Sequence, residues 1–314
     1  MVTLLLPFII GLNCRAQDVP TGGAFTNKLL TAESEDPTKA VSEINGKLTY
    51  AGGLMDGFAG QNFDGSVTIP IMHQFGFQAD GLYSRISNLS FDGGAGHLFW
   101  RDPQIGLLGI TGGYLYREGV DTYQVGVEGE YYWRRFTFSA FGGVGSIKYA
   151  QPVPFISTDP TRAIVRVSAG FYPVDNLLTK VSYTREFNNN LLEGNLEFQT
   201  PIRGLALTGE AAIGSHHYDQ MLFGITYYFG RNKSLIDRHR QDDPPSMMQQ
   251  ILYGLGLYGA DYTDKENQYI AANPGSGGGG DYGDYGDVTI STGNNIVAGN
   301  GGDGGISITP ILPP

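Results

Sequence analysis

The 314-residue chain has no run of eighteen apolar residues after its N-terminus, which excludes a helical membrane protein. It has one cysteine, Cys14, so it can form neither an internal disulfide nor a cysteine-based metal site. Charged residues are scarce at 16%, and the net charge of −11 argues against nucleic acid as a partner. Glycine and the aromatic residues are abundant instead, with 47 Gly, 19 Tyr and 17 Phe. The information on the fold therefore lies in how these residues alternate.

Apolar residues alternate with small or polar ones from about residue 44 to residue 230. Between 123 and 133, the odd positions are Tyr, Val, Val, Gly, Tyr and Trp, whereas the even positions include Gln124, Glu128 and Glu130. A strand turns successive side chains to opposite faces, so this segment has one apolar and one acidic face. Aromatic residues lie at both ends of the apolar face, as in membrane-spanning strands with interfacial girdles.

Twelve such segments predict an all-β fold, a transmembrane antiparallel up-and-down β-barrel of about twelve strands. Glycines inside the strands would weaken a soluble sheet, but they permit tight curvature in a small barrel. The predicted strands are 44–54, 66–71, 75–85, 91–101, 106–117, 123–133, 136–147, 162–172, 177–186, 191–200, 205–214 and 218–230.

The links between these segments predict which end of the barrel faces outward. Links after even-numbered strands are tight, whereas links after odd-numbered strands are longer, notably 56–65 and 148–160. Bacterial outer-membrane barrels have short periplasmic turns and longer outer loops. With an even number of strands, this pattern predicts that both termini are periplasmic.

The composition along the chain predicts five parts in a protein exported to the outer membrane of a Gram-negative bacterium. The apolar run before Cys14 is typical of a signal peptide, although Cys14 leaves a lipoprotein as an alternative. The parts are a signal peptide (1–16), a flexible lead-in (17–42), the barrel (43–230), a short helical or extended periplasmic segment (231–258) and a Gly/Asp-rich disordered tail (259–314).

The parity of the strands assigns a set of charged residues to the barrel interior. With acids in the majority, a water-filled interior would favour cations. A barrel of twelve strands is intermediate in size between a side-chain-filled eight-stranded barrel and an open sixteen-stranded porin. The strand number is therefore compatible with a narrow pore and with a filled interior. The candidates for lining the lumen are Asp80, Glu128, Glu130, Arg162, Arg166, Lys180, Glu193, Glu197 and Glu210.

The histidines do not form a pattern that indicates catalysis or metal binding. No Ser lies at a matching spacing from His216-His217, and that pair lacks further ligands nearby. His97 next to Phe99-Trp100 is interpreted as a membrane-interface residue. We therefore expect no enzyme, no cofactor and no metal. The expected partners are outer-membrane lipid and small ions or solutes, with an unknown periplasmic partner for the tail.

Several motifs resemble a known group of proteins. The runs 97–103, 106–109 and 127–132, and the segment 233–245 after the last strand, resemble poorly characterised proteobacterial outer-membrane barrels. More distantly, Gly106-Leu107-Leu108-Gly109 and the following Glu-Tyr strand are similar to the twelve-stranded barrel of intimin- and invasin-type inverse autotransporters. The resemblance covers about 44–245, and the large extracellular domains of the inverse autotransporters have no counterpart here. It implies an outer-membrane barrel and carries over no functional residues.

Together these observations predict a narrow porin-like channel with an acidic lumen. The alternative is a structural or surface-interaction barrel, adhesin-like and without transport.

Overall fold

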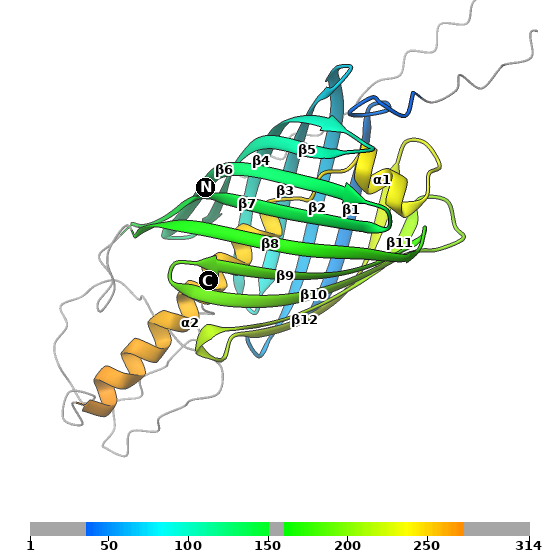
Figure 1. Ribbon diagram of the computed structural model, residues 1–314. Helices are drawn as coiled ribbons and strands as arrows, with labels where there is room; N and C mark the ends of the chain where they lie inside the picture. Colours follow the sequence, from blue (N-terminus) through cyan, green and yellow to red (C-terminus); the bar gives the residue numbers. More distant parts are fainter. Residues whose placement is uncertain (1–35, 151–159, 273–314) are drawn as a thin grey trace, which may run out of the picture. The chain divides into compact units, whose positions relative to one another are not determined.

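The computed structural model describes residues 36–150 and 160–272, and these residues form a closed β-barrel (Figure 1). Residues 1–35, 151–159 and 273–314 lie outside the described part, and with them the expected signal peptide and most of the expected tail. The strands are β1 (Asn45–Met55), β2 (Phe58–Met72), β3 (Phe75–Ile86), β4 (Leu89–Asp102), β5 (Gly106–Arg117), β6 (Val120–Trp133), β7 (Phe136–Tyr149), β8 (Thr161–Val174), β9 (Leu177–Glu186), β10 (Asn189–Gln199), β11 (Leu205–Gly214) and β12 (Asp219–Phe229).

Each strand pairs antiparallel with its neighbours in the chain, and β1 pairs with β12 to close the barrel. This last pairing runs from Gly46 opposite Phe229 to Met55 opposite Gln220, so it extends along almost the whole of both strands. Closure removes the sheet edges and pairs the backbone N–H and C=O groups that hydrocarbon could not hydrogen-bond. The prediction of a twelve-stranded antiparallel barrel is confirmed.

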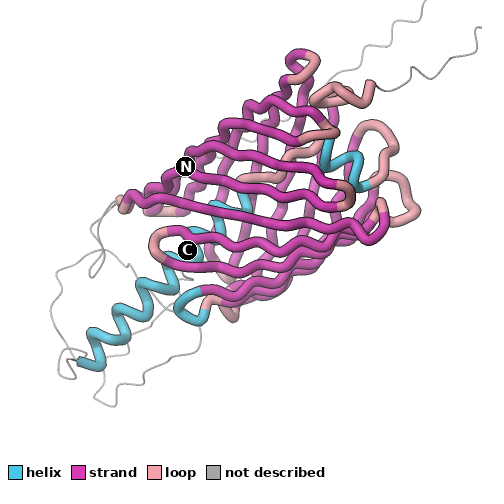
Figure 2. Tube along the Cα trace, in the orientation of Figure 1, coloured by secondary structure: helices cyan, strands magenta, loops and turns pink. Residues whose placement is uncertain are grey.

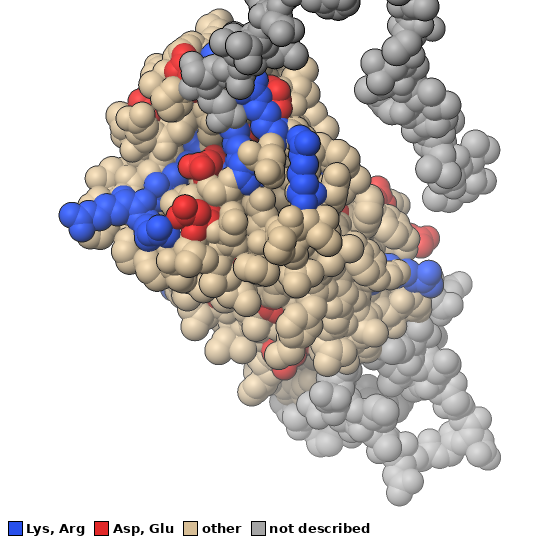
Figure 3. Space-filling model, turned by 90° about the vertical axis from the view of Figure 1, so that its right-hand side faces the viewer, with Lys and Arg blue, Asp and Glu red and all other residues tan. Residues whose placement is uncertain are grey.

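The two ends of the barrel are named here by the helices found at them. At the α1 end, β1 begins, β12 ends and helix α1 (Leu235–Gln241) follows. At the α2 end lie the β1–β2 turn and the short 3-10 helix η1 (Ser215–His217), and helix α2 (Met248–Ala272) leaves the barrel there (Figures 1 and 2). Figure 3 faces the α1 end and shows Lys and Arg side chains grouped on it. The exposed arginines of that rim include Arg134, Arg135 and Arg203.

The expected long link at 56–65 is wrong, because those residues belong to β2 except for a two-residue turn. Asp56 and Gly57 have positive φ values of 50° and 80°, which is the backbone of a type I′ hairpin turn. Asp-Gly is a preferred sequence for that turn, so the signal was present in the chain. Most links at both ends have two residues, and the link at 150–160 is the longest. Loop length therefore indicates which end of the barrel faces outward only at the link 150–160.

The outer face of the barrel is apolar and has aromatic residues near both ends. Phe75, Phe77 and Trp133 are exposed near the α1 end, and Tyr83 and Tyr116 are exposed near the α2 end. Aliphatic side chains such as those of β5 and β6 are exposed between these bands. This arrangement matches the apolar belt and aromatic girdles of a membrane-spanning barrel. No helix in the described ranges is long and apolar enough to cross a membrane.

The C-terminal segment occupies the interior of the barrel, which corrects two expectations. Helix α2 continues to Ala272, so residues 259–272, which were assigned to the tail, are helical. Residues 242–247 and this helix together carry the chain from the α1 end to the α2 end (Figure 1). The described chain therefore begins at one end of the barrel and finishes at the other. The expected periplasmic position of residues 242–258 is wrong, because they lie in the lumen. The two termini lie outside the described residues, so their location on one side stays a prediction.

Candidate functional site in the barrel lumen

The chain after β12 is first anchored at the α1 end. Ser234 caps helix α1, because its side chain accepts a hydrogen bond from the backbone N–H of Asp237. Leu235 of this helix is fully buried with Tyr172 and Tyr228 of the wall. Asp242 follows the helix and accepts hydrogen bonds from the backbone N–H and hydroxyl of Ser42, at 2.9 and 2.7 Å. The segment before β1 and the segment after β12 thus meet at this end.

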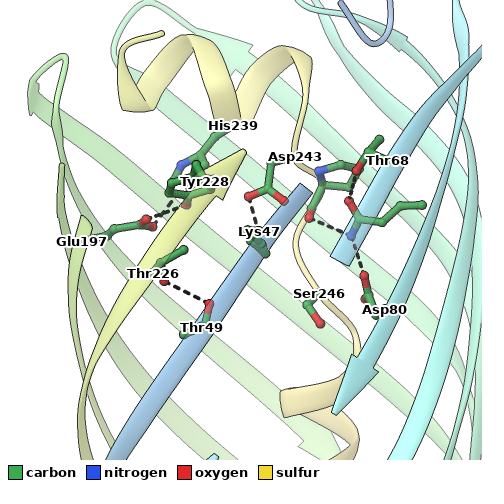
Figure 4. Close-up of polar contacts among 12 residues, drawn as sticks. Lys47, Thr49, Thr68, Asp80, Glu197, Thr226, Tyr228, His239, Asp243 and Ser246 are labelled. Carbon is green, nitrogen blue, oxygen red and sulfur yellow. Dashed lines mark hydrogen bonds and ion pairs between the residues drawn. The ribbon is translucent and has the colours of Figure 1, made fainter. Parts of the chain in front are cut away.

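His239 of α1 contacts three side chains of the lumen wall, of which Tyr228 and Glu197 are drawn in Figure 4. Its Nδ1 lies 2.9 Å from the hydroxyl of Tyr172, and its Nε2 lies 3.1 Å from the hydroxyl of Tyr228. The Tyr228 hydroxyl donates to Glu197 Oε1 at 2.6 Å, and Glu197 Oε2 lies 3.4 Å from His239 Nε2. These contacts join α1 to β8, β10 and β12.

The connector between the helices, residues 242–247, enters the lumen along β1 and β3 (Figure 4). Lys47 donates to Asp243 Oδ2 at 2.9 Å, and both side chains are largely buried. Gln78 donates to the carbonyl oxygen of Pro244 at 3.1 Å. Polar wall residues therefore pair with the polar groups of the connector, as buried polar groups require.

Asp80 is the contact between the wall and the start of α2. One carboxylate oxygen accepts the backbone N–H of Met247 at 3.0 Å, just before the first residue of the helix. The first N–H groups of a helix have no partner within it, and a negative charge there is favourable. Asp80 also accepts from Gln78 at 2.8 Å and lies 3.0 Å from His97 Nε2. A wall residue thus caps a helix 167 positions further along the chain.

His97 faces the lumen and does not lie at the membrane interface, so the earlier interpretation is wrong. It is 1% exposed and lies between two carboxylates, Asp80 on one side and Glu128 on the other. Its Nδ1 is 3.0 Å from Glu128 Oε1. Ionised carboxylates only accept hydrogen bonds, so this geometry suits an imidazolium that donates from both nitrogens. The signal in the sequence was the shared inward parity of these three residues on β3, β4 and β6.

A cavity of about 240 Å³ lies between the C-terminal segment and the lumen wall. Glu193 reaches it while only 6% exposed, and in the described part of the chain neither Glu193 nor Lys180 forms an ion pair or hydrogen bond with a side chain. Seven of the nine candidate lumen residues line this cavity: Glu128, Glu130, Arg166, Lys180, Glu193, Glu197 and Glu210.

The other two candidate residues lie elsewhere. Asp80 is buried in the lumen beside the connector and touches the cavity wall through His97. Arg162 has an exposed side chain at the α2 end of β8, where it donates to the carbonyl oxygen of Thr161. The structure also brings Lys47 to the cavity, as the inward parity of its strand predicts, together with His97 and His239, which the sequence did not indicate as lumen residues.

The first half of α2 is surrounded by apolar wall residues. Leu252, Tyr253 and Leu255 are each at most 2% exposed, although successive helical residues point about 100° apart. Glycines in the wall make room for the helix: a Cβ at Gly113 would lie 2.7 Å from Ile251 Cδ1. Gly254 of the helix lies against Glu186, where a Cβ would be 2.1 Å from a carboxylate oxygen. This half of the lumen is filled by side chains.

His216 holds α2 where it leaves the barrel. Its Nδ1 lies 2.7 Å from Asp264 Oδ2, and its Nε2 lies 3.3 Å from Asp261 Oδ1 and 3.0 Å from Asn189 Oδ1. His216 has a positive φ of 60°, so the wall chain adopts an uncommon backbone conformation at this contact. No group of three or more potential ligands placed to hold a metal ion occurs within the described ranges.

Comparisons with known proteins give similarity at the level of the barrel. The KdgM porin aligns with 59% of this chain and 99% of its own length, at 8% identity and a TM-score of 0.43. The COG4313 outer membrane channel from Pseudomonas putida F1 aligns with 62% of this chain and 98% of its own length, at 9% identity and a TM-score of 0.44. No family model matches the chain, and no curated protein does. Similarity this low specifies neither a solute nor a partner.

Proposed function

We propose that this protein is an outer-membrane β-barrel that holds its own C-terminal segment in the lumen and passes the following chain to the other side of the membrane. The observation that carries this proposal is the path of the chain. It leaves β12 at the α1 end, runs through the lumen as the connector 242–247, and leaves as α2 beside η1. A barrel filled in this way serves as an anchor for its C-terminal chain.

We further propose that the α1 end is periplasmic and the α2 end faces outward. The longest link, at 150–160, lies at the α2 end, and outer-membrane barrels place their longer loops outside. The exposed end of α2 then lies at the cell surface. This orientation favours the surface-interaction alternative among the functions expected from the sequence, and it replaces the idea of a periplasmic tail.

Cysteine labelling on intact cells tests the path. Single cysteines replace Asn88 in a turn at the α2 end, Gln268 on the exposed part of α2, and Arg134 in a turn at the α1 end, all with Cys14→Ser. A membrane-impermeant maleimide should label Asn88→Cys and Gln268→Cys in whole cells. Arg134→Cys should react only after the outer membrane is permeabilised.

Two results would contradict the proposal in different ways. Labelling of Arg134→Cys and Gln268→Cys together, without Asn88→Cys, would show that the helix does not pass through the barrel. Labelling of Arg134→Cys alone would reverse the orientation and leave the path intact.

A second candidate function is the narrow, cation-preferring channel. The cavity favours it, because seven carboxylates line it against Lys47, Arg166, Lys180 and two histidines. In the described conformation α2 closes this route, so the channel requires a state in which the helix has moved.

Planar-bilayer recordings of the full chain test the channel. Discrete openings that prefer cations would support it, and substituting Glu193→Gln should then lower the cation preference, with the exposed Asp92→Asn as a control. A folded protein that inserts but stays silent under all applied voltages would leave the anchor as the function.

A further inference from the structure

The lumen is divided into two parts of opposite chemistry. Towards the α1 end it contains the charged cavity and the connector, where Lys47, Asp80 and His97 form hydrogen bonds and ion pairs. Towards the α2 end it contains a collar, which we define as the apolar wall residues packed around Ile251, Leu252 and Leu255. The boundary between these two parts lies near the start of α2.

The collar surrounds the helix on all sides. Its wall side chains come from strands around the circumference, and each is at most 8% exposed. They include Met55, Ile86, Phe91, Leu115, Ile147 and Leu222, from β1, β3, β4, β5, β7 and β12. Strands β8, β10 and β11 contribute to the same cluster. The glycine contacts at positions 113 and 214 bring helix side chains directly against the wall backbone.

Polar side chains interrupt the collar on one side, where Glu186 lies with Arg166 and Thr184. Glu186 is fully buried, receives a hydrogen bond from Gln124, and lies against Gly254. These side chains do not provide a continuous polar route, because the space that they line has no room for a water molecule. An ion crossing here would lose its hydration without a matching set of ligands, which is strongly unfavourable.

We propose that the apolar collar around α2 is the permeability barrier of this barrel, whereas the charged contacts of the connector only hold the segment in position. Water and small cations then reach the cavity from the α1 end and stop at the collar. This inference rests on the proposed location of the barrel in a membrane. It assigns closure to packing at Leu252 and Leu255 and not to the ion pair of Lys47 with Asp243.

Variants of the full chain separate these two roles. Leu252→Ser with Leu255→Ser makes the collar polar, Leu252→Met with Leu255→Met keeps it apolar, and Lys47→Met with Asp243→Asn removes the connector ion pair without leaving a lone charge. Each is refolded into phosphatidylcholine vesicles loaded with potassium. The serine variant should release potassium roughly tenfold faster or more than the native chain, since a wetted constriction conducts. The other two should stay within about twofold of the native rate.

Accessibility of single cysteines gives a second measurement that does not need the serine variant to fold. Gln250→Cys, at the cavity, should react from the α1 side with a small charged methanethiosulfonate. Leu255→Cys, in the collar, should not react. Equal reaction rates at both positions, or fast potassium release from the connector variant alone, would overturn the assignment of the barrier.

The proposed membrane location fails in a different way. If the chain is not a membrane barrel, all four proteins will fail to insert into vesicles, and they will stay in the dense fraction of a flotation gradient while the vesicles rise. If the proteins insert but the collar serine variant releases potassium no faster than the native chain, the collar is not the permeability barrier. The membrane location then still holds.

Discussion

Single side chains of the lumen wall hold the C-terminal segment, and Asp80 uses both of its carboxylate oxygens to do so. It accepts from Met247 and Gln78 and pairs with His97, which in turn pairs with Glu128. An acid on the inner face of a barrel strand is commonly interpreted in terms of a solute path. The partners of Asp80 belong to the chain itself, so the role of this carboxylate is structural.

We expect Asp80→Ala to lower the free energy of unfolding by about 3 kcal/mol, because it leaves a buried histidine with one partner fewer and α2 without its cap. Asp80→Asn, which can still accept from Met247, should cost about half as much. The measurement is urea unfolding in lipid vesicles followed by tryptophan fluorescence. Asp92→Ala, at an exposed position, should change stability by less than about 0.5 kcal/mol. If Asp80→Ala also changes the free energy of unfolding by less than about 0.5 kcal/mol, α2 is held by packing alone.

Two elements of the fold, the β1–β2 hairpin and helix α2, depend on their local sequence to different degrees. The β1–β2 hairpin exists because Asp56-Gly57 adopts the paired positive φ values of a type I′ turn. Helix α2 contains Gly254, Gly256 and Gly259, which each disfavour a helix by about 1 kcal/mol relative to alanine. It forms because the barrel wall buries it on every side. Local sequence was thus sufficient for the hairpin and insufficient for the helix.

The hairpin at Asp56 should make stability depend on pH. Burial, with a smaller contribution from Asp219, raises the pKa of Asp56 to about 6. A raised folded-state pKa favours the protonated form in the folded chain, so its contribution is fully present below about pH 4 and is lost as pH rises through about 6. Asp56→Asn should therefore stabilise the barrel at pH 8 by about 1 kcal/mol and have little effect at pH 4.

Asn-Gly also suits a type I′ turn, so the Asp56→Asn substitution keeps the hairpin. Urea midpoints at pH 4, 6 and 8 measure the effect. Asp175→Asn in the turn at the other end serves as a control for general charge removal, and an identical pH profile in both variants would contradict the role of Asp56.

At the scale of the molecule, closure of the β1–β12 pairing and filling of the lumen produce one unit from segments far apart in the chain. The segment before β1 is tied to the connector through Ser42 and Asp242, and α2 contacts strands on all sides. Removing the C-terminal segment would leave the inward charges and the collar without their partners. The barrel and its C-terminal segment therefore make one folding unit.

A closed barrel of this kind should resist denaturation by detergent at room temperature. We expect the folded protein to migrate faster on a detergent gel than the boiled protein, because the paired strands keep it compact. The collar serine variant should lose the fast-migrating form at a lower temperature than the native chain. A protein that migrates identically with and without boiling would contradict the closed barrel.

The alternation of side chains determined the strands, their number and the face that each residue presents, because a period of two is a local property of a strand. It also determined which charges turn inward, as with Glu193 and Lys180 at the cavity. Only the tertiary structure decided what those charges contact. One partner of Asp80, Met247, lies 167 residues away, and the buried sides of α2 are defined by a wall that encircles them. A contact of that range depends on barrel closure, and no periodicity within the segment 242–272 encodes it.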